Sequence, residues 1–162
     1  MSTSSRIAVG SDSRDPVADQ VAATLDAAGF AVIRCGAVDA AATPWPEVAE
    51  QVARLVAQGA AEAGVVFCWT GTGVSIAANK VPGIRAALCK DAETARAARR
   101  WNAANVLALA LDGATPEGTQ AIVDAFLGTG GIDPAEVANV RRVTAMERRY
   151  GAPGGGERAR EP

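Results

Sequence analysis

The sequence predicts a single α/β domain in which helices cover both faces of a five-stranded parallel sheet. Short apolar runs alternate along the chain with longer stretches of helical periodicity. The apolar runs are continuous, which is typical of parallel strands that are buried on both faces. A length of 162 residues suits one domain, and an apolar fraction of 49% lies in the globular range.

The elements follow in regular order. Asp15 and Pro16 stand where an N-cap and a first-turn proline belong, and Thr115 is the N-cap predicted for a later helix. A loop containing Trp45 leads into the second helix, which ends near residue 58. The predicted strands cover residues 6–10, 31–35, 64–68, 84–88 and 106–109. The other predicted helices cover residues 16–28, 74–80, 91–101, 116–127 and 135–150. This order predicts a three-layer, doubly wound, Rossmann-like fold.

Residues 1–150 are predicted to form this domain. The remaining segment, 151–162, is rich in glycine, proline and charge, and it is predicted to be a disordered tail because it cannot bury apolar surface.

The composition excludes several classes of protein. A net charge of -2 with no basic run argues against a nucleic-acid partner. No apolar stretch is long enough to span a membrane, and the N-terminus lacks a signal-peptide pattern. We therefore expect a soluble cytoplasmic protein.

The chain contains no histidine, and its three cysteines, Cys35, Cys68 and Cys89, lack metal-ligand spacing. A zinc site is not expected, because histidine and paired cysteines are its usual ligands. The odd number of cysteines indicates free thiols. Any catalysis would rest on Cys, Asp, Glu, Lys, Tyr, Ser or Thr side chains.

The strongest local feature is residues 68–80, in which Cys68 ends a buried strand and a glycine-rich turn leads into a helix. Backbone N–H groups at such a turn can bind an anion, and a thiol there can act as a base next to a carbonyl. The alternative is a buried core cysteine followed by a turn needed only for packing. A dinucleotide site is a weaker interpretation, because Ile76 occupies the place of the third glycine.

Each of the other candidates also has a structural alternative. Asp12, after Ser11 at the end of the first strand, could hold a substrate hydroxyl or cap a turn. Asn102 and Asn105 are loop amides, which commonly bond to backbone. Arg142, paired with Arg141, could bind phosphate or lie on a solvated helix face.

Residues 68–80, continued by 81–89, resemble the ribose-5-phosphate isomerase B family, which includes galactose-6-phosphate isomerase subunits. The shared pattern is a cysteine, a glycine loop, Ser-Ile-Ala-Ala-Asn-Lys and a Gly-Ile-Arg-Ala-Ala strand. Residues 10–12, 91–107 and 142–143 resemble the family's other segments. The resemblance covers about residues 6–149.

The resemblance implies an aldose–ketose isomerase that needs no metal or cofactor and works through an enediolate. It implies a homodimer or dimer of dimers, with each active site built from both subunits. Cys68, Asp12 and Thr70 are the implied catalytic residues, with Cys68 as the base. The implied substrate-binding residues are Ser11, Ser13, Trp69, Gly71, Thr72, Gly73, Ser75, Trp101, Asn102 and Arg142.

The chain also departs from the family pattern. Ser13 and Trp101 replace the histidines at the phosphate and at the ring-opening step, and Lys90 replaces a third histidine. Ala138 stands near a family arginine, Trp69 replaces a loop glycine, and Trp45 lies in the loop that bears a tyrosine in the family. Losing a ring-opening acid or base would slow the isomerisation of a closed sugar about 100- to 10,000-fold.

Three hypotheses follow. The chain is an isomerase for an unphosphorylated or already open substrate, with Lys90, Asp12 or a partner group in place of the lost histidine. Alternatively, it catalyses another proton transfer, such as enolisation, dehydration or cyclisation in a biosynthetic pathway. Finally, it is a non-catalytic binding protein on the same fold.

Overall fold

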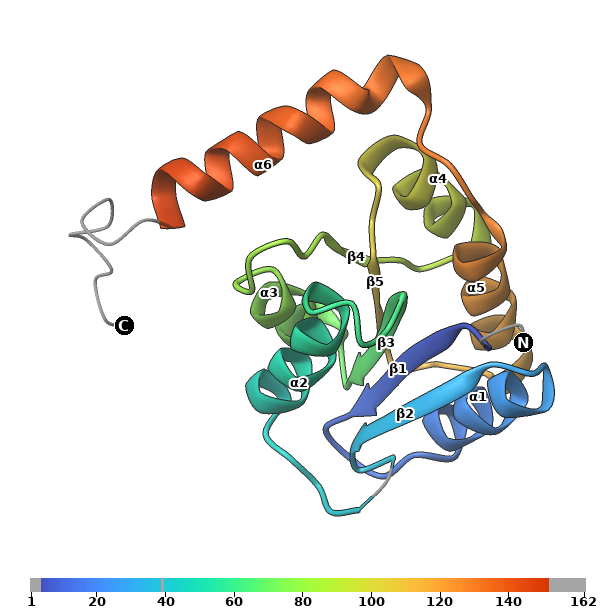
Figure 1. Cartoon of the computed structure of the whole chain (residues 1–162). Coiled ribbons are helices and arrows are strands. Elements are labelled where there is room, and N and C mark those ends of the chain that lie inside the picture. The colour runs from blue at the N-terminus through green and yellow to red at the C-terminus, as the bar shows by residue number, and fades with distance from the viewer. Residues whose placement is uncertain (1–3, 39, 152–162) are drawn as a thin grey trace.

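The computed structural model describes residues 4–38 and 40–151, and its centre is a five-stranded, all-parallel sheet (Figure 1). The spatial order of the strands is β2-β1-β3-β5-β4. The strands are β1 (Arg6–Ser11), β2 (Ala31–Gly36), β3 (Ala63–Cys68), β4 (Ala86–Leu88) and β5 (Val106–Ala110). This arrangement confirms the predicted fold class.

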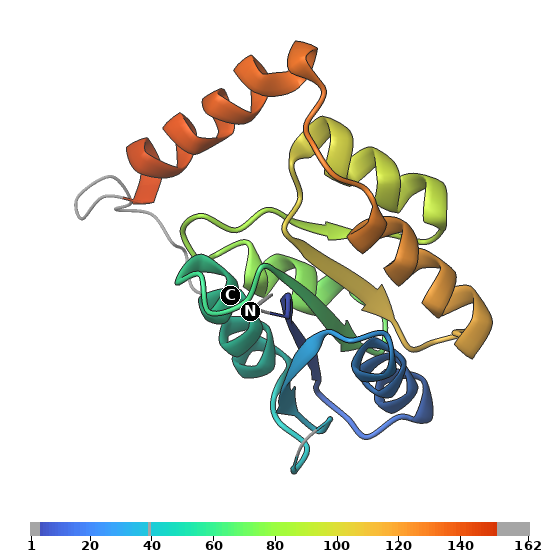
Figure 2. The same ribbon diagram turned by 45° about the vertical axis from the view of Figure 1, so that its right-hand side comes forward.

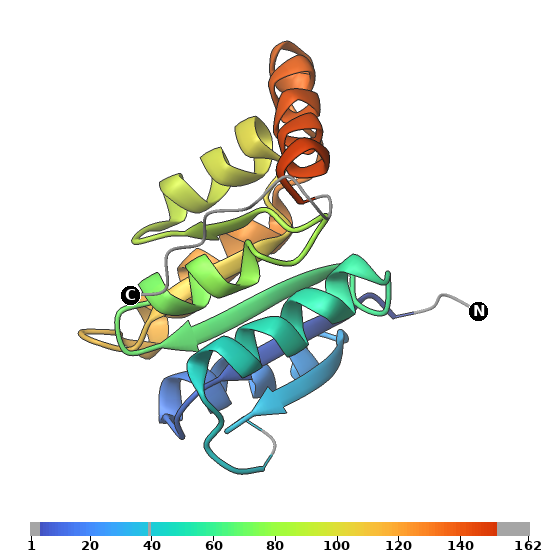
Figure 3. The ribbon, with the colours of Figure 1, turned by 90° about the vertical axis from the view of Figure 1, so that its left-hand side faces the viewer.

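The helices form a layer on each side of the sheet, as Figures 2 and 3 show from two further directions. Buried side chains join α1, α4 and α5 to one face, and α2 and α3 to the other. The helices are α1 (Pro16–Ala27), α2 (Trp45–Ala57), α3 (Thr72–Ala78), α4 (Ala92–Asn102), α5 (Pro116–Gly128) and α6 (Val137–Gly151), with a short 3-10 turn η1 (Pro134–Glu136) before α6.

Strand β3 is buried along its whole length and divides the core into two halves. Successive side chains of a strand point to opposite faces. Phe67 therefore packs with Phe126 of α5 on one side, while Cys68 lies with Val74 of α3 on the other. Fully burying a side chain of this size contributes about 1.5–3 kcal/mol, so β3 is the centre of the apolar core.

Strand β4 is shorter than the predicted 84–88, and asparagine side chains bond to the backbone at its start. The Asn79 amide accepts from the Ala86 N–H at 2.8 Å and donates to the Ala86 carbonyl at 2.9 Å. Asn105 Oδ1 accepts from the Arg85 N–H at 2.8 Å. Asn79 and Asn105 therefore have a backbone-bonding role at this edge of the sheet.

Helix α3 begins at Thr72, two residues before the predicted start. Gly71 is the N-cap in a left-handed conformation, with φ of 73°, and its carbonyl accepts from the Ser75 N–H at 3.2 Å. Gly73 consequently lies inside the first turn of the helix.

Helix α6 stands apart from the sheet and its covering helices (Figure 1). None of its residues is buried, and Val143, Met146 and Tyr150 expose more than half of their surface. One tie to the main body is the Gly83 N–H, which donates to Glu147 Oε1 at 2.9 Å.

The predicted tail, 151–162, falls almost wholly outside the described residues, and only Gly151 is seen, at the end of α6. Within residues 4–38 and 40–151, no helix is long and apolar enough to cross a membrane.

Candidate active site

Asp12 and Cys68 lie at the carboxyl ends of neighbouring strands. Strand β1 pairs with β2 on one side and β3 on the other, so the chain reverses its direction of winding between β1 and β3. In open parallel sheets, ligands bind at such a switch point, beyond the carboxyl ends of the strands.

A cavity of about 300 Å³ opens at this point. Cys68 is only 5% exposed, yet it lines the cavity. A thiol in this position is largely shielded from bulk water but remains accessible to a ligand. The lining residues are Asp12, Trp45, Cys68, Trp69, Thr70, Thr72 and Gly73.

Backbone contacts hold Trp45 at the cavity. The Asp12 N–H donates to the Phe67 carbonyl at 3.3 Å, and the Asp12 carbonyl accepts from the Thr43 N–H at 3.0 Å. These bonds tie the loop before α2 to the strand ends. The Trp45 ring then lies over Gly73, where a Cβ atom would come within 3.0 Å of it.

Trp45 is a lining residue that the set of predicted site residues omits. The signal for it in the sequence is its place in the segment that bears a tyrosine in the family; the fold shows that Trp45, at the start of α2, lines the cavity with Cys68.

Hydroxyl groups surround the cavity. The Thr70 and Thr72 hydroxyl oxygens lie 2.6 Å apart, close enough for one to donate to the other. The Ser13 hydroxyl donates to Asp12 Oδ1 at 3.0 Å, and the buried Ser11 hydroxyl donates to the Ser13 carbonyl at 2.7 Å. Ser11 and Ser13 thus brace the turn that presents Asp12 and do not line the cavity themselves.

The other predicted binding residues are not brought to this cavity within one protomer. Helix α4 starts after the carboxyl end of β4 and returns to the amino end of β5. Trp101 and Asn102 therefore lie at the amino ends of the strands, on the side of the sheet away from the cavity. Arg142 is on α6, where its guanidinium donates to Asn139 Oδ1 at 2.6 Å. Ser75 contributes backbone hydrogen bonds within α3, and its side chain is not part of the lining.

The cavity carries little charge. Asp12 is the only ionisable residue besides Cys68 among the lining residues, and none of them is lysine or arginine. The indoles of Trp45 and Trp69 are 44% and 64% exposed. A cavity with this lining favours a ligand that has both an apolar face and hydroxyl groups.

No group of three or more Cys, Asp or Glu side chains that could hold a metal ion occurs in the described part of the chain. Lys90, a suggested substitute for a lost histidine, lines a different cavity from Cys68.

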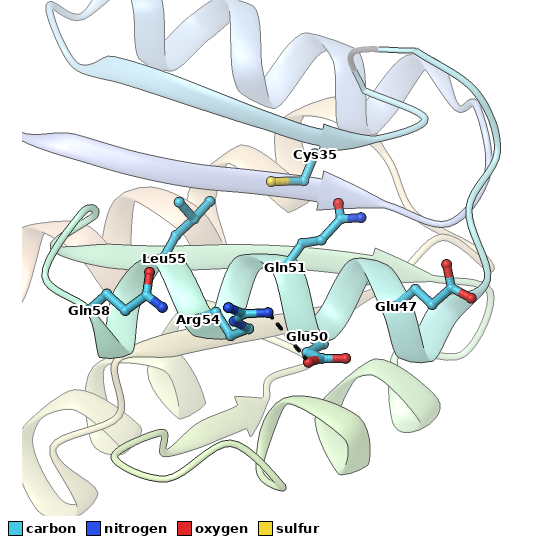
Figure 4. Close-up of a pocket in the computed structure, with 7 residues that line it drawn as sticks. All are labelled: Cys35, Glu47, Glu50, Gln51, Arg54, Leu55 and Gln58. Atoms are coloured by element: carbon cyan, nitrogen blue, oxygen red, sulfur yellow. Dashed lines mark ion pairs between the residues drawn. The ribbon is translucent and has the colours of Figure 1, made fainter.

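A larger cavity, of about 510 Å³, lies between β2 and α2 (Figure 4). Cys35 lines it, together with Gln51, Leu55 and other residues of α2. Its arginine, Arg54, is already near Glu50, at 3.9 Å, and both side chains are well exposed. None of the predicted site residues lines this cavity, so it is not the candidate active site.

The fold is that of an α/β protein with a doubly wound parallel sheet, and its candidate ligand site, with a thiol beside a glycine turn, lies over the ends of β1 and β3. The family model for Ribose/Galactose Isomerase matches residues 7–146. The chain therefore belongs to the ribose/galactose isomerase family, and it is an isomerase-family enzyme.

Individual relatives agree with this assignment. The chain is 38% identical over 130 residues to ribose-5-phosphate isomerase B of Escherichia coli, covering 80% of this chain and 87% of that protein. It is 41% identical over 104 residues to a galactose-6-phosphate isomerase subunit of Clostridium acetobutylicum, covering 64% and 60%. The structure of Clostridium thermocellum ribose-5-phosphate isomerase B matches with a TM-score of 0.83 at 34% identity, covering 90% and 99%.

Proposed function

We propose that the chain is an aldose–ketose isomerase in which Cys68 moves a proton between neighbouring carbons of a carbonyl substrate. The observation that carries the proposal is the position of Cys68, a buried thiol that lines an open cavity at the switch point of the sheet. In the reaction, the Cys68 thiolate takes the proton from the carbon next to the carbonyl. The released electron pair forms a carbon–carbon double bond, and the carbonyl oxygen becomes an enediolate oxygen. Return of the proton to the other carbon completes the transfer.

The neighbouring residues have separate parts in this proposal. Backbone N–H groups of Gly71, Thr72 and Gly73 stabilise the enediolate oxygen, because donors that are fixed in advance bind developing charge well. The Asp12 carboxylate accepts from a substrate hydroxyl. Thr70, held by its hydrogen bond with Thr72, supplies a hydroxyl to move the proton between the two substrate oxygens.

The substrate differs, in this proposal, from the sugar phosphates named for the relatives. The cavity has no cation in its lining to bind phosphate, and Ser13 stands where the resemblance expects a phosphate-binding histidine. Without a ring-opening histidine, an open-chain carbonyl compound is the best substrate. We propose an unphosphorylated substrate whose apolar face stacks on Trp45 and Trp69.

A second candidate is another proton transfer in the same cavity, such as enolisation, dehydration or cyclisation. The exposed indoles favour it, because they suit a larger and more apolar carbonyl compound. A purely binding role has less support: a filled pocket would favour it, whereas the cavity beside Cys68 is open and Trp101 lies elsewhere.

The active enzyme is a homodimer or dimer of dimers in this proposal. The exposed apolar residues of α6, Val143, Met146 and Tyr150, offer a surface for a second copy. Trp101, Asn102 and Arg142 could then reach the cavity of the partner. The expectation of a cytoplasmic location also stays a prediction.

The proposal is tested by assaying the full chain with D-erythrulose, an unphosphorylated open-chain ketose, and with D-ribose 5-phosphate. We expect isomerisation of D-erythrulose to be the faster reaction. Substituting Cys68→Ala should lower its rate at least about 100-fold, since it removes the base. Cys35→Ala is the matched control, because Cys35 is also a buried thiol at the end of a strand but lines a different cavity.

Full activity in Cys68→Ala would refute the proposed base. If neither compound is isomerised but a larger carbonyl compound binds at Trp45 and Trp69, the second candidate function is favoured.

A further inference from the structure

A second cavity also lies beyond the carboxyl ends of the strands, as the cavity beside Cys68 does. It is found where β4 and β5 end and where α4 and α5 begin. We name it the β4–β5 cavity, and its volume is about 410 Å³. Leu109 and Ile122 give it an apolar floor, and Cys89 and Thr119 lie among the residues that line it. Lys90, Asp91 and Asp112 form its charged rim. None of these residues takes part in the chemistry proposed for Cys68.

Thr119 has an unused hydroxyl in this cavity. The residue is only 5% exposed, and its hydroxyl makes no hydrogen bond with any residue from 4–38 or 40–151. By contrast, the buried Ser11 hydroxyl is satisfied by the Ser13 carbonyl. The Thr119 hydroxyl oxygen is not itself fully buried, so water or a ligand in the cavity can bond to it.

The two helix starts do not make the cavity an anion site. At α4, the Asp91 carboxylate accepts from the Thr94 N–H at 2.7 Å, and this bond lowers the pKa of Asp91, which keeps it ionised. At α5, Thr115 Oγ1 accepts from the Gly118 N–H at 3.2 Å. Both starts are therefore capped by the chain's own side chains, and an anion would also meet the carboxylate of Asp112.

Cys89 also presents a neutral group. Burial, followed by the charge of Asp91, raises the pKa of its thiol to about 11, so the thiol keeps its proton at neutral pH. The cavity thus combines an apolar floor, a neutral hydroxyl and a neutral thiol with a rim of two carboxylates and one cation, Lys90.

We propose that the β4–β5 cavity is a second binding site, which takes a neutral, hydroxyl-rich ligand such as an unphosphorylated sugar or polyol. The carbon face of such a ligand packs on Leu109 and Ile122, and one hydroxyl bonds to Thr119. Other hydroxyls donate to Asp112, since an ionised carboxylate only accepts. A few placed polar groups on an apolar wall are typical of small-molecule sites.

This site does not depend on the proposed isomerase activity. Its lining shares no residue with the cavity beside Cys68, and the Asp112 N–H of its rim donates to the Trp69 carbonyl at 2.9 Å. Binding in the β4–β5 cavity should therefore persist in Cys68→Ala, whether or not the enzyme turns over D-erythrulose.

The test is a titration of the ¹⁵N-labelled full chain with D-galactose, followed by amide chemical shifts, and a parallel titration with D-galactose 6-phosphate. We expect D-galactose to shift the amides of Cys89, Gly113 and Thr119. The phosphate should bind there about 5-fold more weakly, because the two carboxylates of Asp91 and Asp112 outweigh the single positive charge of Lys90 at the rim.

Thr119→Val removes the hydroxyl while keeping the shape, and it should weaken D-galactose binding about 2- to 10-fold. Thr24→Val is the matched control, since Thr24 is a helical threonine outside the cavity. If Thr119→Val does not fold, Asp112→Asn at the exposed rim should give a loss of similar size.

Three results would overturn the proposal. The first is an absence of shifts at Cys89, Gly113 and Thr119 in the folded wild-type chain. The second is equal or tighter binding of D-galactose 6-phosphate at these amides. The third is an affinity that neither Thr119→Val nor Asp112→Asn changes.

Discussion

Gly71 is the residue whose backbone sets the shape of the loop beside Cys68. Its φ of 73° is left-handed, and a Cβ atom would lie 2.6 Å from Leu88 Cδ1 and 2.8 Å from the Leu109 carbonyl carbon. Gly71→Ala should therefore lower the free energy of unfolding by about 2–4 kcal/mol, through backbone strain and overpacking together.

Urea unfolding measures this effect, and Gly59→Ala is the control. Gly59 has a similar φ, 72°, but a Cβ atom there would meet no atom within 4 Å. We expect that control to lose only about 1–2 kcal/mol, from strain alone. Equal losses at both positions would show that close packing around Gly71 is not important.

Cys89 makes stability depend on pH in the alkaline range. Its pKa is raised from 9.0 to about 11, first by burial and then by Asp91, so the folded protein holds the thiol proton more tightly than the unfolded chain does. The stabilisation is complete below about pH 9 and is lost as the pH rises through 11. The loss is on the order of 2 kcal/mol.

The measurement is the urea unfolding free energy of the wild type and of Cys89→Ala between pH 8 and about 11. The wild type should lose more stability than the variant over this range. Parallel curves for the two proteins would contradict a buried, protonated Cys89.

Some residue roles were predictable from the sequence and others were not. Asp15 and Thr115 are N-caps as predicted, because capping depends on neighbours in the chain. The role of Asn79 at the edge of β4 was not predictable, because it depends on which backbone groups the tertiary fold leaves unpaired.

Among the elements, the long apolar strands were predicted well and the short ones less well. Strand β3 is a buried run whose sequence is unambiguous, whereas β4 has only one neighbour, β5, and is reduced to three residues. The predicted start of α3, at residue 74, lies two residues after the observed start, because glycine normally argues against a helix. Gly73 is accommodated there because the Trp45 ring occupies the space of a side chain.

Helix α6 should form a subunit interface. Val143, Met146 and Tyr150 share one side of the helix, and all are more than half exposed. Met146→Asp should raise the dimer dissociation constant roughly 100-fold, since it would bury a charge without a partner. Sedimentation equilibrium measures this constant.

Ala145→Asp is the control for charge alone, because Ala145 lies on the opposite side of α6 and should leave the dimer intact. A wild-type chain that is monomeric at high concentration, or two variants that dissociate equally, would contradict the proposed interface.

At the scale of the whole molecule, the β–α alternation predicted the layers but not the order of the strands. The order β2-β1-β3-β5-β4 depends on long-range packing, and it is what places Asp12 beside Cys68. The alternation of strands and helices alone does imply that α4 ends near the amino ends of the parallel strands. The family resemblance, which implies a site shared between subunits, nevertheless predicts that Trp101 and Asn102 act together with Cys68.

The proposed activity of the whole molecule rests on proton transfer by Cys68 at the switch point of the sheet. Isomerisation through an enediolate exposes the transferred proton to solvent exchange, so deuterium should enter the substrate in heavy water. Proton NMR of D-erythrulose in ²H₂O, with the purified chain, measures this exchange directly.

We predict loss of the signal of the proton next to the carbonyl with the wild type and with Cys35→Ala. With Cys68→Ala, the rate of exchange should fall at least about 100-fold. Exchange at the wild-type rate in folded Cys68→Ala would contradict the account.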